Sequence, residues 1–116
     1  MTQTAESKSR LIAEAASDKK ALDIVIMNMH DLTTTTDYFI VCSATTSTQV
    51  RAIADNIEEE MAKAGETFLH KEGYRNAEWI LLDFGNCIVH VFTEEARRFY
   101  GLEDLWGEAP TEHYED

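Results

Sequence analysis

The chain has 116 residues, of which 44% are hydrophobic and 28% charged, a composition typical of one soluble globular domain. Its 22 acidic and 10 basic residues give a formal net charge of −12, which disfavours binding dominated by nucleic acid and favours a basic protein partner, although acidity can also serve solubility alone. No apolar run approaches the ~20 residues of a membrane span, and the N-terminal segment lacks the apolar core of a signal peptide. We therefore expect a cytoplasmic protein without membrane contact.

The first half of the chain contains signals for a helix and two strands. Apolar residues at helical spacing predict a helix over residues 5–16 that ends near Ser17 and Asp18. Residues 22–29 and 37–43 are apolar and rich in branched side chains, so both favour strands, joined by the polar residues 33–36. Residues 38–42 do not alternate with polar ones, which indicates a strand covered on both faces.

The clearest element is a second helix. Thr46 and Gln49 have the spacing of a capping box, in which side chains satisfy the free amide groups at a helix start. A buried stripe then follows the helical repeat, formed by Val50, Ile53, Ala54, Ile57 and Met61. Gly65 predicts the end of this helix.

The second half of the chain predicts three strands, a helix and a tail. Residues 66–71 favour a weak strand, and residues 79–83 and 87–92 favour strong strands joined by a short glycine-containing hairpin link. Thr93 can cap a last helix that ends at Gly101. We expect an α/β fold with a mixed sheet of about five strands flanked by helices. It would form a single domain over residues 1–107, followed by an acidic, flexible tail over residues 108–116.

Residues that could carry catalysis or bind a metal are sparse. The four histidines lack the close spacing of zinc ligands, and His90 fits a sheet-face histidine that makes one hydrogen bond. Cys42 and Cys87 lie in apolar strands, as inert buried thiols do. Cys42 and Ser43 end a strand before a helix, where a nucleophile could stand, but only the distant His90 could serve as its base. We therefore predict no catalytic residue, no metal site and no cofactor.

The order and spacing of several sequence blocks resemble the RsfS/Iojap family of ribosomal silencing factors, from about residue 10 to residue 107. These blocks are residues 18–25 (DKKALDIV), 37–43 (DYFIVCS), 49–55 (QVRAIAD), 72–73 (EG), 79–92 (WILLDFGNCIVHVF), 97–100 (RRFY), 102–103 (LE) and 105–106 (LW). The resemblance implies a nucleotidyltransferase-like fold that performs no transfer chemistry. Cys42, Ser43 and Ala44 stand where those enzymes are expected to have a Gly-Ser pair. Their Asp-x-Asp metal pair does not occur in the sequence.

The same resemblance implies a partner. It is ribosomal protein fourteen of the large ribosomal subunit, whose occupation would sterically block association with the small subunit and repress translation. The alternatives are an enzyme on a nucleotidyltransferase-like scaffold and an acidic adaptor for another basic protein. We expect a monomer or a weak homodimer.

The C-terminal region suggests where such a partner would bind. Residues 94–116 contain eight acids and two bases, a net charge of −6, around large apolar side chains. Apolar anchors ringed by charge are typical of binding hot spots. We expect a docking surface formed by Trp79, Asp83, Tyr100, Leu102, Leu105 and Trp106. The competing interpretation is that Leu102 and one of the aromatic residues instead close the core.

Overall fold

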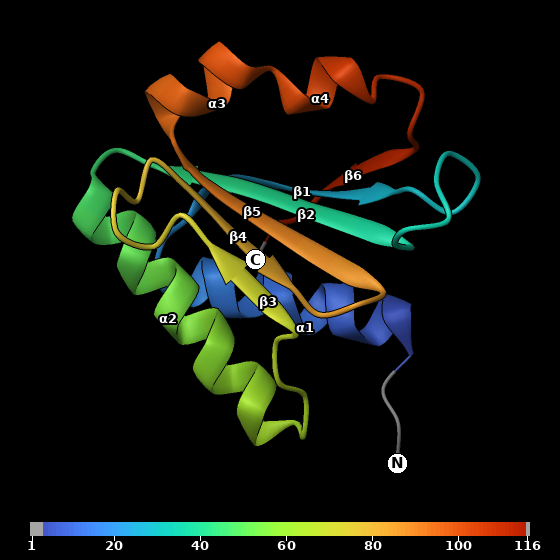
Figure 1. Ribbon diagram of the computed structural model, residues 1–116, viewed down its shortest axis with the longest axis horizontal. Helices are drawn as coiled ribbons and strands as arrows, with labels where there is room; N and C mark the ends of the chain where they lie inside the picture. Colours follow the sequence, from blue (N-terminus) through green and yellow to red (C-terminus); the bar gives the residue numbers. More distant parts are fainter. Residues whose placement is uncertain (1–3, 116) are drawn as a thin grey trace.

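The computed structural model describes residues 4–115 and shows one sheet between two layers of helices (Figure 1). In chain order the elements are α1 (Ala5–Asp18), β1 (Leu22–Asn28), β2 (Tyr38–Ala44), α2 (Ser47–Lys63), β3 (His70–Glu72), β4 (Trp79–Asp83), β5 (Cys87–Thr93), α3 (Glu94–Tyr100), α4 (Leu102–Leu105) and β6 (Thr111–His113).

The sheet has six strands in the order β3-β4-β5-β2-β1-β6. The two central strands, β2 and β5, run parallel, and every other neighbouring pair is antiparallel. Both central strands are buried on both faces, which confirms the two-sided burial predicted from the unbroken apolar run at residues 38–42. The predicted α/β class with a mixed sheet is confirmed, with one strand more than expected.

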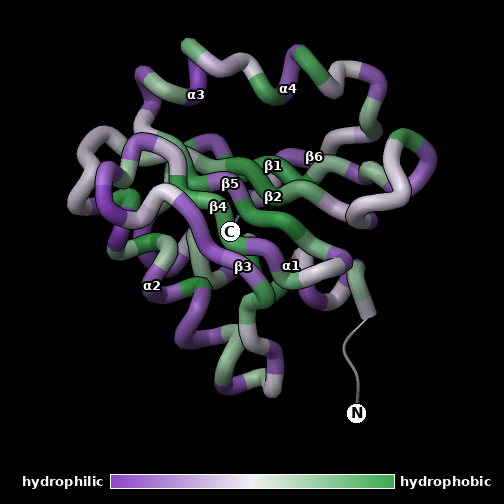
Figure 2. The backbone as a smooth tube through the Cα atoms, in the orientation of Figure 1, coloured by the Kyte–Doolittle hydropathy of each residue, from purple (hydrophilic) through white to green (hydrophobic). Residues whose placement is uncertain are grey.

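Each face of the sheet has its own core. Helices α1 and α2 cover one face, and α3 and α4 lie along the other, as Figure 1 shows. Figure 2 shows the four inner strands in green and β3 in purple, so the apolar residues concentrate at the centre of the sheet. The core beneath α1 and α2 is the larger, and the other centres on Val25, Met27, Phe39, Val41 and Phe92.

The two threonine caps act as predicted, whereas the side chain of Gln49, expected to complete a capping box, instead donates to the carbonyls of Lys19 and Lys20 at 3.3 and 3.4 Å. The Thr46 hydroxyl accepts a hydrogen bond from the Gln49 amide at 3.1 Å, and Thr93 caps α3 through the Ala96 amide at 3.2 Å. Gly101 has a φ of 57° and ends α3 in the left-handed conformation, which favours glycine.

Two predictions in the second half of the chain were inaccurate. The strand predicted at residues 66–71 is short, covers His70–Glu72 and begins later, because pairing starts where β4 offers a partner, with His70 opposite Asp83. A single helical turn, α4, follows Gly101 and was not predicted. Gly101 ends α3, yet its carbonyl accepts from the amides of Asp104 and Leu105, both at 3.1 Å, and so starts the next turn.

The acidic segment after residue 107 differs from the loosely ordered tail that its composition suggested. Within it, β6 pairs antiparallel with β1, with Met27 opposite Thr111 and Val25 opposite His113. All three β6 side chains are exposed, so no apolar pattern marks this strand in the sequence. The pairing is a backbone interaction that completes the free edge of β1, and composition does not report such pairing.

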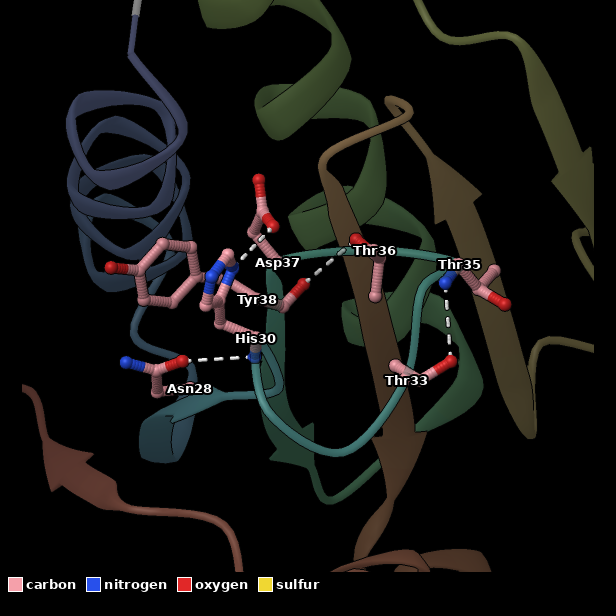
Figure 3. Close-up of polar contacts among 7 residues, drawn as sticks. All are labelled: Asn28, His30, Thr33, Thr35, Thr36, Asp37 and Tyr38. Atoms are coloured by element: carbon pink, nitrogen blue, oxygen red, sulfur yellow. Dashed lines mark hydrogen bonds and ion pairs between the residues drawn. The ribbon is translucent and has the colours of Figure 1, made fainter.

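The polar connection between β1 and β2 is a turn held by its own side chains (Figure 3). The Asn28 carboxamide accepts from the His30 amide at 3.0 Å, and the His30 ring lies 3.3 Å from Asp37. Thr33 accepts from the Thr35 amide at 3.1 Å. Short polar side chains therefore replace secondary structure here by bonding to nearby backbone.

Between residues 4 and 115, none of the helices has the length and apolar character needed to cross a lipid bilayer.

Candidate docking surface

The face of the sheet that carries α3 and α4 is only partly covered by them. Side chains alternate along β4, so Ile80 and Leu82 are buried towards α1 and α2, whereas Trp79, Leu81 and Asp83 point to the α3 and α4 side and remain partly exposed. This confirms that Trp79 and Asp83 share a face. It also leaves the β4 margin of that face open to a partner.

Trp79 lies in a cluster of aromatic rings. Its indole stacks on Phe92 with ring centres 5.0 Å apart, and Tyr100 of α3 packs against it at 4.8 Å. The indole N–H donates to Nδ1 of His90 at 3.0 Å. Trp79 is half-buried and Tyr100 is 50% exposed, so the structure brings these two predicted residues into direct contact at the surface.

The α4 turn supplies the apolar edge of the surface. Leu102 and Trp106 pack half-buried against the core on this face, and Trp106 meets Phe39 edge-on with ring centres 6.1 Å apart. These contacts agree with the competing interpretation, in which Leu102 and one aromatic residue help to close the core. Leu105 is different: its side chain is 74% exposed. Because residues three and four apart lie on one side of a helical turn, Leu105 borders Leu102.

Asp83 lies at the far end of β4, about 13 Å from Trp79 by the rise of a strand. Its carboxylate accepts from the Gly85 amide at 2.7 Å and so stabilises the β4–β5 turn. Asp83 therefore shares a face with the aromatic cluster but lies apart from it. Its side-chain hydrogen bond stabilises the turn.

Arg97 fastens α3 to the sheet. Its guanidinium donates to the Ser43 hydroxyl at 3.1 Å and to the Leu22 carbonyl at 3.4 Å. It also bonds to the Glu103 carboxylate at 2.7 Å. Glu103 is one of the eight acids counted in residues 94–116, but this ion pair offsets its charge. The exposed Asp104 therefore remains as the acid beside Leu105.

The sheet separates Cys42 from His90, whereas Ser43 faces the same side as His90, where its hydroxyl accepts from Arg97 of α3. Cys42 belongs to the core beneath α1 and α2, whereas His90 alternates with Val89 and Val91 of that core and points to the other face. Burial raises the pKa of both Cys42 and Cys87 to about 12, so both remain uncharged thiols at neutral pH. Within residues 4–115, no group of three or more acidic, histidine or cysteine side chains could hold a metal ion.

Comparison with known proteins shows the family and the fold of the chain. The family model for the ribosomal silencing factor during starvation, RsfS, matches residues 2–116. The chain belongs to the RsfS family. The ribosomal silencing factor RsfS of Halalkalibacterium halodurans is 39% identical over 102 residues, which cover 88% of this chain and 87% of that protein. The Bacillus subtilis protein of the same name is 39% identical over 101 residues, 87% of this chain and 86% of that one.

A solved structure shares the fold of this RsfS-family chain. The crystal structure of a Chromobacterium violaceum protein matches with a TM-score of 0.89 at 32% identity, and covers 90% of this chain and 88% of that one. The resemblance inferred from the ordered sequence blocks is thereby confirmed. The family is one of ribosomal silencing factors and not an enzyme family.

Two residues of this RsfS-family chain that shape the surface were not predicted to do so from the sequence. His90 was expected to make one structural hydrogen bond, which the structure confirms, but its partner was not foreseen to be Trp79. Arg97 was counted only as a charge. The available signal was indirect: His90 and Trp79 belong to strands predicted to form a hairpin, in which diagonal neighbours come within reach.

We expect His90 to make this RsfS-family chain less stable in mild acid. Burial lowers the pKa of His90 to about 4, against about 6.5 in the unfolded chain, so the unfolded chain takes up the proton first as pH falls. The stabilisation that the folded chain gains from the lowered pKa of His90 is fully present above pH ~6.5 and is lost as the pH falls towards ~4. The total loss in the free energy of unfolding is about 3 kcal/mol. Urea unfolding of wild type and His90→Asn across this range measures it. The free energy of unfolding should fall less steeply with acid in the variant, and parallel profiles would contradict the expectation.

Proposed function

We propose that this protein binds the large ribosomal subunit through ribosomal protein fourteen, sterically blocks association with the small subunit and so represses translation in the cytoplasm. The match of the RsfS family model to residues 2–116 carries the proposal. The relatives from Halalkalibacterium halodurans and Bacillus subtilis bear the name ribosomal silencing factor. We further propose that the protein acts as a monomer or a weak homodimer.

Two features of the molecule support a docking role. Trp79 lies at the open margin of the sheet, and Tyr100 of α3 and Leu105 of α4 are exposed on the same side of the molecule. Large side chains of this kind dominate the energy of most interfaces. The net charge of −12 favours a basic partner such as a ribosomal protein.

Sedimentation with purified ribosomal subunits tests the proposal. We expect the protein to migrate with isolated large subunits, and the fraction of joined ribosomes to fall as the protein is titrated in. Migration with small subunits alone, or unchanged joining at saturation, would refute it.

The same gradient separates the two alternatives. An acidic adaptor for another basic protein would stay out of the large-subunit peak. An enzyme on this scaffold should bind nucleotide in the presence of magnesium, which isothermal titration measures directly. Either result would replace the silencing function.

Association with large subunits should slow as salt rises. Exposed charges are screened within ~8 Å at physiological ionic strength, so the attraction between this acidic chain and a basic partner weakens. Electrostatic steering acts mainly on the rate of encounter. Stopped-flow or surface-based kinetics across roughly 50 to 500 mM salt should show the association rate constant falling more than the dissociation rate constant rises. An association rate constant that does not change across the series would exclude steering.

A further inference from the structure

His90 is a buried polar residue whose presence stability alone does not explain. It lies in the middle of β5, only 4% exposed, between Leu81 of β4 and Val41 of β2. Within residues 4–115, its Nε2 has no hydrogen-bond partner. An unpartnered buried polar group destabilises the folded state, a cost that a leucine at this position would avoid. A costly polar group retained in a core points to a role for the one hydrogen bond that it does make.

That hydrogen bond determines the state of the ring. The indole N–H of Trp79 can only donate, so Nδ1 of His90 must be unprotonated where it accepts at 3.0 Å. The neutral ring therefore carries its proton on Nε2. Burial favours this uncharged form and lowers the pKa of His90 to about 4, so the acceptor is present throughout the neutral range.

The other contacts of Trp79 do not select an orientation for its indole. Phe92 and Tyr100 pack against the ring at 5.0 and 4.8 Å and restrict its plane. A half-turn about the second side-chain torsion would keep that plane and exchange the two edges of the indole, so these ring contacts do not choose between the two orientations. A hydrogen bond is directional. The bond to His90 therefore fixes which edge of the indole is buried and which edge faces solvent.

We propose that His90 is a positioning residue that holds the Trp79 indole in the orientation in which it docks. This inference rests on the proposed function, because it takes Trp79 to be an anchor for the large-subunit protein. His90 itself lies beneath the surface and acts through Trp79. An anchor ordered before binding loses less conformational entropy on docking, which for one large side chain corresponds to about a two- to tenfold gain in affinity.

Two substitutions at this position separate the hydrogen bond from packing. His90→Asn keeps an acceptor oxygen near the place of Nδ1, whereas His90→Leu keeps the bulk and removes the acceptor. The first readout is the indole N–H resonance of Trp79 in the free protein, identified by its loss in Trp79→Phe. We expect that resonance to stay near its wild-type position and exchange rate in His90→Asn. In His90→Leu it should move and exchange faster.

The second readout is affinity for purified large subunits. His90→Leu should bind about two- to tenfold more weakly than wild type, and His90→Asn should recover most of that loss. In a Trp79→Phe background, which lacks the donor, leucine and asparagine at position 90 should give equal affinities. If His90→Leu fails to fold, Trp79→Phe alone tests the same bond, because it removes the donor and leaves the histidine in place. Wild-type affinity in Trp79→Phe would overturn the proposal.

Two further results would overturn the proposal, and a third would remove its basis. An unchanged indole resonance in His90→Leu would overturn the proposal, as would wild-type binding once the indole is released. If wild-type protein does not bind large subunits, the proposed function fails and the positioning role fails with it. The indole resonance distinguishes the two failures, because it is measured without ribosomes and still reports whether His90 orders Trp79.

Discussion

Replacing Trp79 by alanine is expected to weaken binding to isolated large subunits by about thirty- to a thousandfold, or about 2–4 kcal/mol. The indole is half-buried between Phe92 and Tyr100, at the margin where α3 leaves the sheet open. Central aromatic anchors of this kind carry most of the energy of an interface. The same contacts also hold the ring in the core, so Trp79→Ala should lower the free energy of unfolding as well.

Leu105 separates docking from folding because its side chain is 74% exposed. Leu105→Ala should bind large subunits more weakly while its urea-unfolding midpoint stays near wild type, since truncation of an exposed side chain changes stability by about 0.5 kcal/mol or less. Leu69→Ala is the matched control: Leu69 is 75% exposed and directly precedes β3. Its amide donates to the carbonyl of Asp83, so Leu69 lies at the opposite end of β4 from Trp79. Leu69→Ala should leave binding unchanged.

Equal binding by wild type, Trp79→Ala and Leu105→Ala would exclude this face as the docking surface. The same holds if Trp79→Ala loses affinity only in proportion to the protein that unfolds and Leu105→Ala binds normally. Weakened binding in Leu69→Ala would instead move the contact to the end of β4 that carries Asp83.

Elements defined by side-chain periodicity were predictable, and those defined by backbone pairing were not. The stripe from Val50 to Met61 predicts α2 because burial of one helical face repeats in the sequence. Strand β6 carries three exposed side chains and exists because β1 had a free edge. A sequence shows which side chains favour burial, but it does not show where an unpaired strand edge will lie in the fold.

Some features of the candidate surface were likewise predictable from the sequence, and others were not. Trp79 and Asp83 were placed on one face because four residues along a strand return to the same side. The hydrogen bond between Trp79 and His90 depends on the register of β4 with β5, in which Leu81 lies opposite His90. That register follows from the geometry of the hairpin turn, which a short glycine-containing link does not specify by itself. The ion pair of Arg97 with Glu103 likewise depends on α4, which was not predicted.

The loop that leads into Trp79 is held by side chains of α2. Arg51 of α2 donates to the carbonyls of Tyr74 and Arg75 at 3.1 and 2.6 Å. Asp55, one helical turn later, accepts from the Tyr74 hydroxyl at 3.0 Å. The loop also turns back on itself, because the Ala77 amide donates to the Gly73 carbonyl at 2.9 Å. Helix α2 thus fixes the point at which β4 begins, and with it the position of Trp79.

Gly73 is the residue of this loop that tolerates substitution least. Its φ is +82°, a left-handed conformation that costs other residues about 1–2 kcal/mol. A Cβ at this position would overlap the carbonyl oxygen of Trp79, which is backbone and cannot rotate away. We therefore expect Gly73→Ala to lower the free energy of unfolding by about 3 kcal/mol or more, because backbone strain and steric overlap add.

Gly65→Ala provides the matched control for that measurement. Gly65 has nearly the same φ, +84°, but a Cβ there would meet no atom within 4 Å. Conformational strain is then the only cost, and we expect a loss of about 1–2 kcal/mol in urea unfolding. The difference between the two variants isolates the overlap with the Trp79 backbone. Gly73→Ala should also shift the Trp79 indole resonance in the folded protein, whereas Gly65→Ala should not. Equal destabilisation by the two substitutions would show that the loop has room to move, and that α2 does not fix the start of β4 as tightly as these contacts indicate.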